Sequence, residues 1–105
     1  MAIQASTEIL EGSVLAILSQ EDYYGYTITK QMQENFPISE STMYPILRRL
    51  KKDGWLTTYD QPYEGRNRRY YKITDTGLTR LAEIRDDWKQ LRTVTDKILE
   101  GNDGE

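Results

Sequence analysis

The spacing of apolar residues changes at Gly54. Before this glycine, apolar side chains recur at the three- and four-residue intervals of amphipathic helices. After it come two runs of aromatic and β-branched residues, Trp55–Tyr59 and Arg69–Thr74, and such runs favour β-strands. The chain is therefore expected to place a set of helices ahead of a small β-hairpin.

Three helices are expected before Gly54. The first covers about residues 8–19, and a short second helix extends from about Tyr26 and ends before Pro37. Ser39 is a suitable N-cap for the third helix, which runs to about Asp53, where Gly54 closes it. The second and third helices follow one another with only a short connection, which is the order of a helix-turn-helix, and the hairpin comes after them.

The third expected helix has two different faces. An apolar stripe directed at the core is formed by Met43, Ile46, Leu47 and Leu50. Hydroxyl residues at its start and cations further along form the candidate DNA-contacting set of Ser39, Ser41, Thr42, Tyr44, Arg48, Arg49 and Lys52. Small residues at a helix N-terminus let backbone N–H groups approach phosphate, and Tyr and Arg can reach base edges. This pattern is typical of a recognition helix, although an ordinary amphipathic surface helix would show the same stripe.

The segment between the two expected strands, residues 60–68, includes Pro62 and Gly65 and is expected to form a loop. A polar cluster on or beside this tip adds four candidate DNA contacts, Arg66, Asn67, Arg68 and Arg69. A helix-turn-helix followed by a basic hairpin predicts a winged helix, in which the third helix enters the major groove and the wing touches nearby DNA. A merely solvated hairpin tip is the alternative.

The net charge of −3 argues at first against a nucleic-acid partner. Residues 48–72, however, carry eight Lys and Arg against three Asp and Glu, a local charge of +5, and the remainder of the chain carries −8. Because salt screens charges beyond about 8 Å, a local basic face matters more for phosphate than the total. A solvated charged face remains the other interpretation.

The composition excludes much chemistry. The chain has neither Cys nor His, so it offers no thiolate nucleophile, no imidazole base and no Cys/His zinc site. An enzyme, a metal and a cofactor are therefore not expected. A length of 105 residues suits one structural unit, and the longest apolar runs, such as Val14–Leu18, are too short to cross a bilayer. With no secretory leader at its start, the chain is expected to be cytoplasmic and free of the membrane.

A fourth helix is expected after Thr74 or Asp75, either of which can cap it. Its apolar residues repeat at heptad-like spacing, with Thr95 as the one interruption, and form the candidate dimer interface Leu81, Ile84, Trp88, Leu91 and Ile98. We therefore expect residues 1–74 to be a winged-helix DNA-binding domain and residues 75–105 a dimerisation helix with a frayed tail from Gly101. The alternative is that the helix packs entirely on the first helix of its own chain.

Several motifs in order resemble the PadR family of transcriptional regulators. They are Tyr24-Gly25-Tyr26, the run from Ser41 to Leu50, Asp53-Gly54-Trp55-Leu56, the run from Gly65 to Thr74, and Gly77. The resemblance implies a winged helix, one C-terminal dimerisation helix and, usually, repression at a palindromic operator. It also implies that Ser41, Thr42, Tyr44 and Arg48 lie on the recognition helix, with Arg66, Arg68 and Arg69 on or beside the wing.

The expected function is that of a homodimeric, DNA-binding transcriptional repressor on an inverted repeat with half-sites about 10 bp, or a multiple, apart. Multidrug-sensing relatives use a Trp on the last helix to hold flat aromatic ligands, so Trp88 is a candidate contact for a planar hydrophobic effector. The alternative interpretation of Trp88 is simple interface core. The alternative function is a winged-helix protein-protein module without DNA binding, which the acidic net charge favours.

Overall fold

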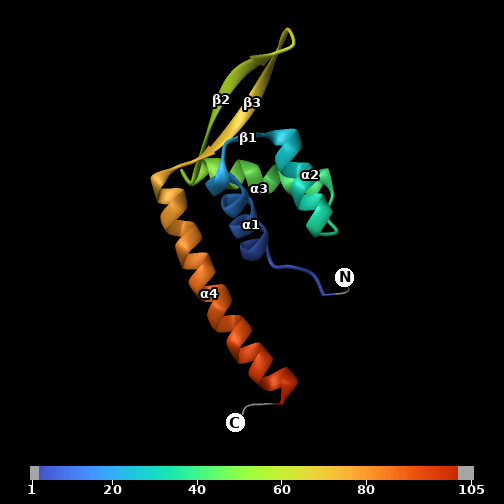
Figure 1. Ribbon diagram of the computed structural model, residues 1–105, viewed down its shortest axis with the longest axis vertical. Helices are drawn as coiled ribbons and strands as arrows, with labels where there is room; N and C mark the ends of the chain where they lie inside the picture. The colour runs from blue at the N-terminus through green and yellow to red at the C-terminus, as the bar shows by residue number, and fades with distance from the viewer. Residues whose placement is uncertain (1–2, 102–105) are drawn as a thin grey trace.

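The computed structural model describes residues 3–101, which are mainly helical and carry one small antiparallel sheet (Figure 1). This is the predicted fold class of a mainly α protein with a β-hairpin. In chain order the elements are α1 (Thr7–Gln20), β1 (Tyr23–Tyr24), α2 (Gly25–Asn35), α3 (Glu40–Lys52), β2 (Leu56–Tyr63), β3 (Arg66–Ile73) and α4 (Asp75–Glu100). No helix in this part of the chain combines the length and apolarity needed to cross a membrane.

Side-chain caps set where three of the helices begin. Ser39 Oγ accepts a hydrogen bond from the Thr42 backbone N–H at 3.3 Å, as its sequence position predicts. Thr74 caps α4 in the same way by accepting from Gly77 N–H at 3.0 Å. Ser6 caps α1. At the other end of α3, Gly54 has a φ of +80°, the left-handed conformation that a residue without Cβ adopts easily, so the helix stops there.

The core lies where α1, α2 and α3 meet the first turns of α4. The stripe predicted on α3 is buried, because Met43, Ile46, Leu47 and Leu50 are all at most 4% exposed. The other buried apolar residues are Leu10, Val14, Leu15, Leu18, Ile28, Met32, Leu56, Leu81 and Ile84. One continuous cluster thus fixes α3 on its inner side and leaves its other side free.

The sheet has the strand order β1-β3-β2, with β3 in the centre and all pairs antiparallel. We call the β2–β3 hairpin the wing. Its turn is Glu64-Gly65, and both residues have positive φ, 51° and 77°, as in the two-residue turns that match strand twist. Pro62 is tolerated inside β2 because an edge strand can spare one N–H donor.

Two details differ from the sequence-based expectation. The expected loop over residues 60–68 is wrong, because both strands continue almost to the tip and the four polar candidates begin β3. The short strand β1 was not expected; Tyr23 pairs with Tyr71 and Tyr24 with Tyr70, which attaches the start of α2 to the base of the wing. The wing is therefore a long ribbon held at its base by a third strand.

Helix α4 packs on α1 with its first half and then continues past the rest of the molecule (Figure 1). The approach is close, because a Cβ added at Gly12 of α1 would come within 2.6 Å of Ile84 Cγ2. With the wing at one end and α4 at the other, the molecule is elongated, with extents of 61 × 29 × 21 Å. The helix ends at Gly101; the expected frayed tail beyond it, residues 102–105, lies outside the described residues.

The N-terminal turns of α4 are fastened to the point where α3 passes into β2. The hydroxyls of Thr74 and Thr76 both donate to the carbonyl oxygen of Gly54, at 2.6 and 2.9 Å. The backbone N–H of Thr74 donates to the Trp55 carbonyl at 3.1 Å, and Arg80 lies 5.2 Å from the centre of the Trp55 ring. We refer to these contacts as the α3–α4 junction.

Candidate nucleic-acid interface

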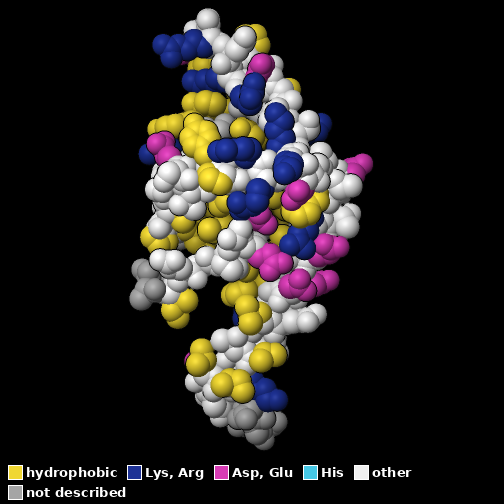
Figure 2. Space-filling model, turned by 180° about the vertical axis from the view of Figure 1, so that it is seen from behind, with side chains coloured by type: hydrophobic (Ala, Val, Ile, Leu, Met, Phe, Trp, Pro, Cys, Tyr) yellow, Lys and Arg dark blue, Asp and Glu magenta, His cyan; other side chains and the backbone are white. Residues whose placement is uncertain are grey.

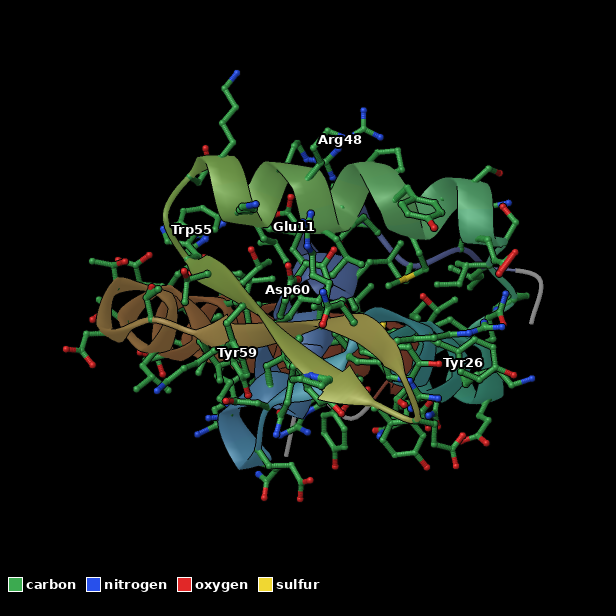
Figure 3. The ribbon with its side chains drawn as sticks, turned by 90° about the horizontal axis from the view of Figure 1, so that it is seen from above. Glu11, Tyr26, Arg48, Trp55, Tyr59 and Asp60 are labelled. Carbon is green, nitrogen blue, oxygen red and sulfur yellow. The ribbon has the colours of Figure 1, made fainter. Side chains whose placement is uncertain are left out.

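Helix α3 presents a polar face away from the core. Ser41, Thr42, Tyr44, Arg48 and Lys52 are all exposed, and Tyr44 keeps 66% of its surface in water. Arg48 points outward from the body of the molecule in Figure 3. The exposure follows from the sequence, because the four buried residues of the stripe occupy one side of the helix and the cap at Ser39 fixes its start. These side chains are therefore accessible to a partner that lies along α3.

At the start of α3 the hydroxyl groups form a small network. Ser39 Oγ lies 2.8 Å from Ser41 Oγ and 3.2 Å from Thr42 Oγ1, in addition to its capping bond. Of these three hydroxyl groups, that of Ser39 caps the helix by accepting from the Thr42 backbone N–H. The N-terminal turn still combines exposed hydroxyls with the positive end of a helix dipole, which favours an approaching anion.

Arg49 lies differently from the other predicted contacts. Its Nε donates to Oε2 of Glu11 at 3.1 Å, so that the side chain bridges α3 and α1. Glu11 is the buried charged residue that Figure 3 shows beneath α3. Because a buried carboxylate is costly without a partner, this pair gives Arg49 a structural role inside the domain.

The four predicted wing residues alternate between the two faces of β3. Arg66 and Arg68 lie on one face with Tyr70, and Asn67 and Arg69 on the other with Tyr71. Arg69 pairs with Asp60 of β2 at 3.5 Å, an exposed contact worth little energy. Arg66 is exposed beside the turn. The cations thus lie along a strand and not on a flexible loop.

A cleft of about 730 Å³ separates the wing from α2 and α3. Residues from all three elements line it, including Tyr26 of α2, Tyr44 of α3 and Arg66 of the wing. Tyr71 also lines the cleft, and burial raises the pKa of its phenol above the ordinary value of 10.0. Sequence reasoning missed Tyr26 and Tyr71, because an aromatic residue at a helix start or on a strand is indistinguishable from core in the sequence.

Charge is distributed unevenly over the surface. On the face seen in Figure 2, Lys and Arg side chains gather over the wing and the adjoining body, and acidic side chains gather lower down. This matches the local charge of +5 over residues 48–72 within a chain of net charge −3. The wing and the adjoining body therefore form the more basic part of this face.

The predicted seam on α4 divides into two parts. Leu81 and Ile84 are buried in the chain's own core, at 2% and 6% exposure, because α1 covers them. Trp88, Leu91 and Ile98 are exposed, and Figure 2 shows hydrophobic side chains along the projecting part of the helix. Two further exposed residues, Val94 and Leu99, were not singled out from the sequence.

Relatives of this chain have been described. The protein family "Transcriptional regulator PadR-like family" matches residues 14–83. An uncharacterized protein of Lysinibacillus sphaericus is 30% identical, over 88% of this chain and 89% of its own length. Transcriptional regulator Rv3488 of Mycobacterium tuberculosis is 29% identical over 84% of this chain and 80% of its own.

Solved structures with a similar fold include a member of the same family. The Streptococcus mutans protein smu.1704 has a TM-score of 0.89 and 40% identity, covering 96% of this chain and 95% of its own. A PadR-like transcriptional regulator from Bacillus cereus has a TM-score of 0.77 and 37% identity, covering 87% and 91%. With its winged-helix fold and a family match over more than half its length, the chain belongs to the PadR-like family of transcriptional regulators.

Proposed function

We propose that this regulator is a repressor that binds double-stranded DNA as a homodimer on an inverted-repeat operator. The observation that carries the proposal is the arrangement of α3 and the wing, which line a single cleft and give it aromatic and cationic side chains. In a winged helix, this arrangement lets one helix enter the major groove while the hairpin follows the neighbouring backbone.

The residues divide by role. Ser41, Thr42, Tyr44 and Arg48 face the major groove, where Arg and Tyr can meet base edges. Lys52 and Arg66 neutralise phosphates to either side, and Ser39 acts through the helix end that it caps. Asn67 and Arg69 also line the cleft, from the strand β3 that carries Arg66. Arg49 contributes by holding α3 on α1.

The dimer is proposed from α4. Residues 1–74 serve as the DNA-binding domain, and residues 75–105 supply the dimerisation helix. Trp88, Leu91 and Ile98 are exposed on a helix that leaves the core, and exposed apolar rows of this kind are usually covered by a partner. A second copy is the simplest partner, since two-fold symmetry would place two copies of α3 about 34 Å apart on one side of the DNA.

Ligand control is the third part of the proposal. Trp88 is 43% exposed on α4 beyond the part that α1 covers. In a symmetric pair of helices, two such indoles could hold a planar hydrophobic effector between them and shift the distance between the DNA-binding units. A purely apolar role in the interface is the competing interpretation for the same residue.

A test of DNA binding begins with selection of duplexes from a random pool by the purified protein. We expect an inverted repeat to emerge, with affinity that falls as salt rises, at a slope of about −0.9 per phosphate contact. Arg48→Glu should abolish binding. Lys97→Glu, which makes the same charge change in the last turn of α4, should have little effect.

Outcomes against the proposal are equally clear. A protein-protein module, the alternative that the net charge of −3 favours, would select no sequence and show no salt slope. If half-sites can be moved apart in steps of a few base pairs without loss of affinity, the symmetric dimer on an inverted repeat is wrong. A reporter gene behind the selected operator separates repression from activation.

A further inference from the structure

The guanidinium of Arg68 lies between two tyrosine rings. Its central carbon is 3.7 Å from the ring centroid of Tyr63 and 4.4 Å from that of Tyr24. A guanidinium is flat and weakly hydrated, so it stacks well on aromatic faces, and both distances are within the range of cation–π attraction. The charged group of Arg68 is therefore held by the protein itself on two sides.

The strand pairing explains the sandwich. Arg68 lies on the central strand β3 opposite Gln61, and Tyr63 is two residues further along β2. On the other side, Tyr24 of β1 pairs with Tyr70, which is two residues from Arg68. Since alternate residues of a strand share a face, all three side chains project from the same face of the sheet, and diagonal neighbours are within reach of long side chains.

The position matters because of where the third strand ends. Strand β1 pairs with β3 through Tyr24 and goes no further, so past Tyr70 the wing has only two strands. A two-stranded ribbon twists easily and is marginal on its own. Tyr24 directly precedes α2, so the sandwich connects the outer half of the wing to the helix-turn-helix.

The contacts next to the sandwich strengthen this connection. The ring of Tyr70 stacks on Tyr59 at a centroid distance of 5.6 Å and meets Tyr24 at 6.1 Å. The hydroxyl of Tyr59 donates to Asp22 Oδ2 at 2.7 Å. One face of the sheet thus carries a continuous aromatic row from the base of the wing to Arg68.

We propose that Arg68 is a positioning residue, which fixes the angle between the wing and α3, and that exposed Arg66 beside the turn makes the phosphate contact. The proposal rests on the DNA binding proposed above and changes the role of one residue in it. It differs from the sequence-based expectation, in which both arginines contact DNA in the same way.

The test measures the affinity of wing variants for the duplex selected by the wild-type protein, by fluorescence anisotropy at several salt concentrations. Tyr63→Leu removes no charge, yet we expect it to weaken binding on the order of three- to tenfold and to make the salt slope shallower by about one, since Arg66 is no longer held in place. Tyr63→Phe keeps the ring and should change neither quantity. Arg66→Gln should reduce the slope by the same amount, and adding Tyr63→Leu to it should cost no further slope.

The result that would overturn the proposal is a Tyr63→Leu variant with wild-type affinity and slope, or effects of Tyr63→Leu and Arg66→Gln that add in full. Proton NMR of the free protein supplies a readout without DNA, because ring currents should shift the Arg68 Hδ signals upfield in the wild type and less so in Tyr63→Leu. Wild-type protein that selects no duplex contradicts DNA binding itself. In that case an upfield shift of the Arg68 Hδ signals would still show that the guanidinium lies between the two tyrosine rings, so that only the proposed DNA binding is contradicted.

Discussion

Arg49 of α3 donates a hydrogen bond to Glu11 of α1 over 3.1 Å, and the two residues are 38 positions apart in the chain. The Glu11 side chain is only 11% exposed, whereas that of Arg49 is 45% exposed. The pair therefore anchors α3 from within the domain.

Replacing Arg49 by Met should lower the free energy of unfolding by roughly 1–3 kcal/mol. The buried carboxylate of Glu11 loses its partner, but solvent at the exposed arginine keeps the loss below that of a fully buried pair. Urea unfolding measures the change. The double variant Glu11→Met/Arg49→Met should recover much of the loss, because it removes the orphaned charge; a single variant as stable as the wild type would show that the pair contributes nothing.

Gly77→Ala should destabilise the fold strongly, although it adds only one methyl group. The added Cβ would come within 2.2 Å of the Trp55 carbonyl oxygen and 2.7 Å of Ile73 Cγ1. A backbone carbonyl cannot change rotamer to avoid the added methyl group, so the α3–α4 junction must open. The free energy of unfolding should fall by about 3 kcal/mol. Thermal unfolding of Gly77→Ala, with Thr79→Ala on the exposed side of the same helix as the control, tests this; equal midpoints would contradict it.

If the proposed dimer forms through α4, Leu91→Glu should convert it to a monomer. Leu91 is 57% exposed on α4, and a carboxylate there would be buried without a partner between two copies. Affinity for a duplex with two half-sites should fall on the order of 100-fold, because the second half-site is no longer bound intramolecularly. Light scattering after size-exclusion chromatography measures the mass. Thr93→Glu, two residues along and on the opposite side of the helix, is the matched control and should remain dimeric.

Alkaline pH should weaken the fold partly through Tyr71. Burial raises the pKa of its phenol above 10.0, so the folded state holds this proton more tightly than the unfolded chain does. The contribution is complete below the unfolded pKa and is lost as pH rises through the folded one. Urea midpoints at about pH 8 and about pH 11 should therefore differ less for Tyr71→Phe than for the wild type. Equal pH dependence would show that Tyr71 titrates normally.

Planar cationic dyes should quench Trp88. The chain has two tryptophans, and Trp55 is half-buried beside Arg80, so a Trp88→Phe variant retains one reporter that lies away from the proposed site. Saturable quenching in the wild type that disappears in Trp88→Phe supports an effector site on α4. Quenching that is the same in both proteins would rule out an effector site at Trp88.

The helices could be predicted from sequence because their signals are local. The cap at Ser39, the stripe on α3 and the stop at Gly54 all lie within one short segment and agree with one another. The outward position of Arg48 followed from helical geometry alone.

The wing and the seam on α4 depend on contacts between distant segments. Pro62 and Gly65 indicate a loop, but the turn closes at Glu64-Gly65 and Pro62 stays in an edge strand. Likewise, a heptad pattern identifies an apolar face without identifying its partner, so it could not separate Ile84, which α1 covers, from exposed Leu91. The contact of Arg68 with Tyr24 could not be predicted either, because Tyr24 is on a strand of two residues, which is too short to leave a signal of its own.

The α3–α4 junction connects α4 rigidly to the end of α3. Thr74 and Thr76 bind Gly54 directly, so a tilt of α4 must carry α3 and the wing with it. A helix of 26 residues is roughly 39 Å long at about 1.5 Å per residue, and a tilt of about 5° displaces one end relative to the other by about 3 Å. In the proposed dimer, a small change in how the two α4 helices cross would then be enough to move the proposed DNA-binding surfaces out of step with the turn of the double helix.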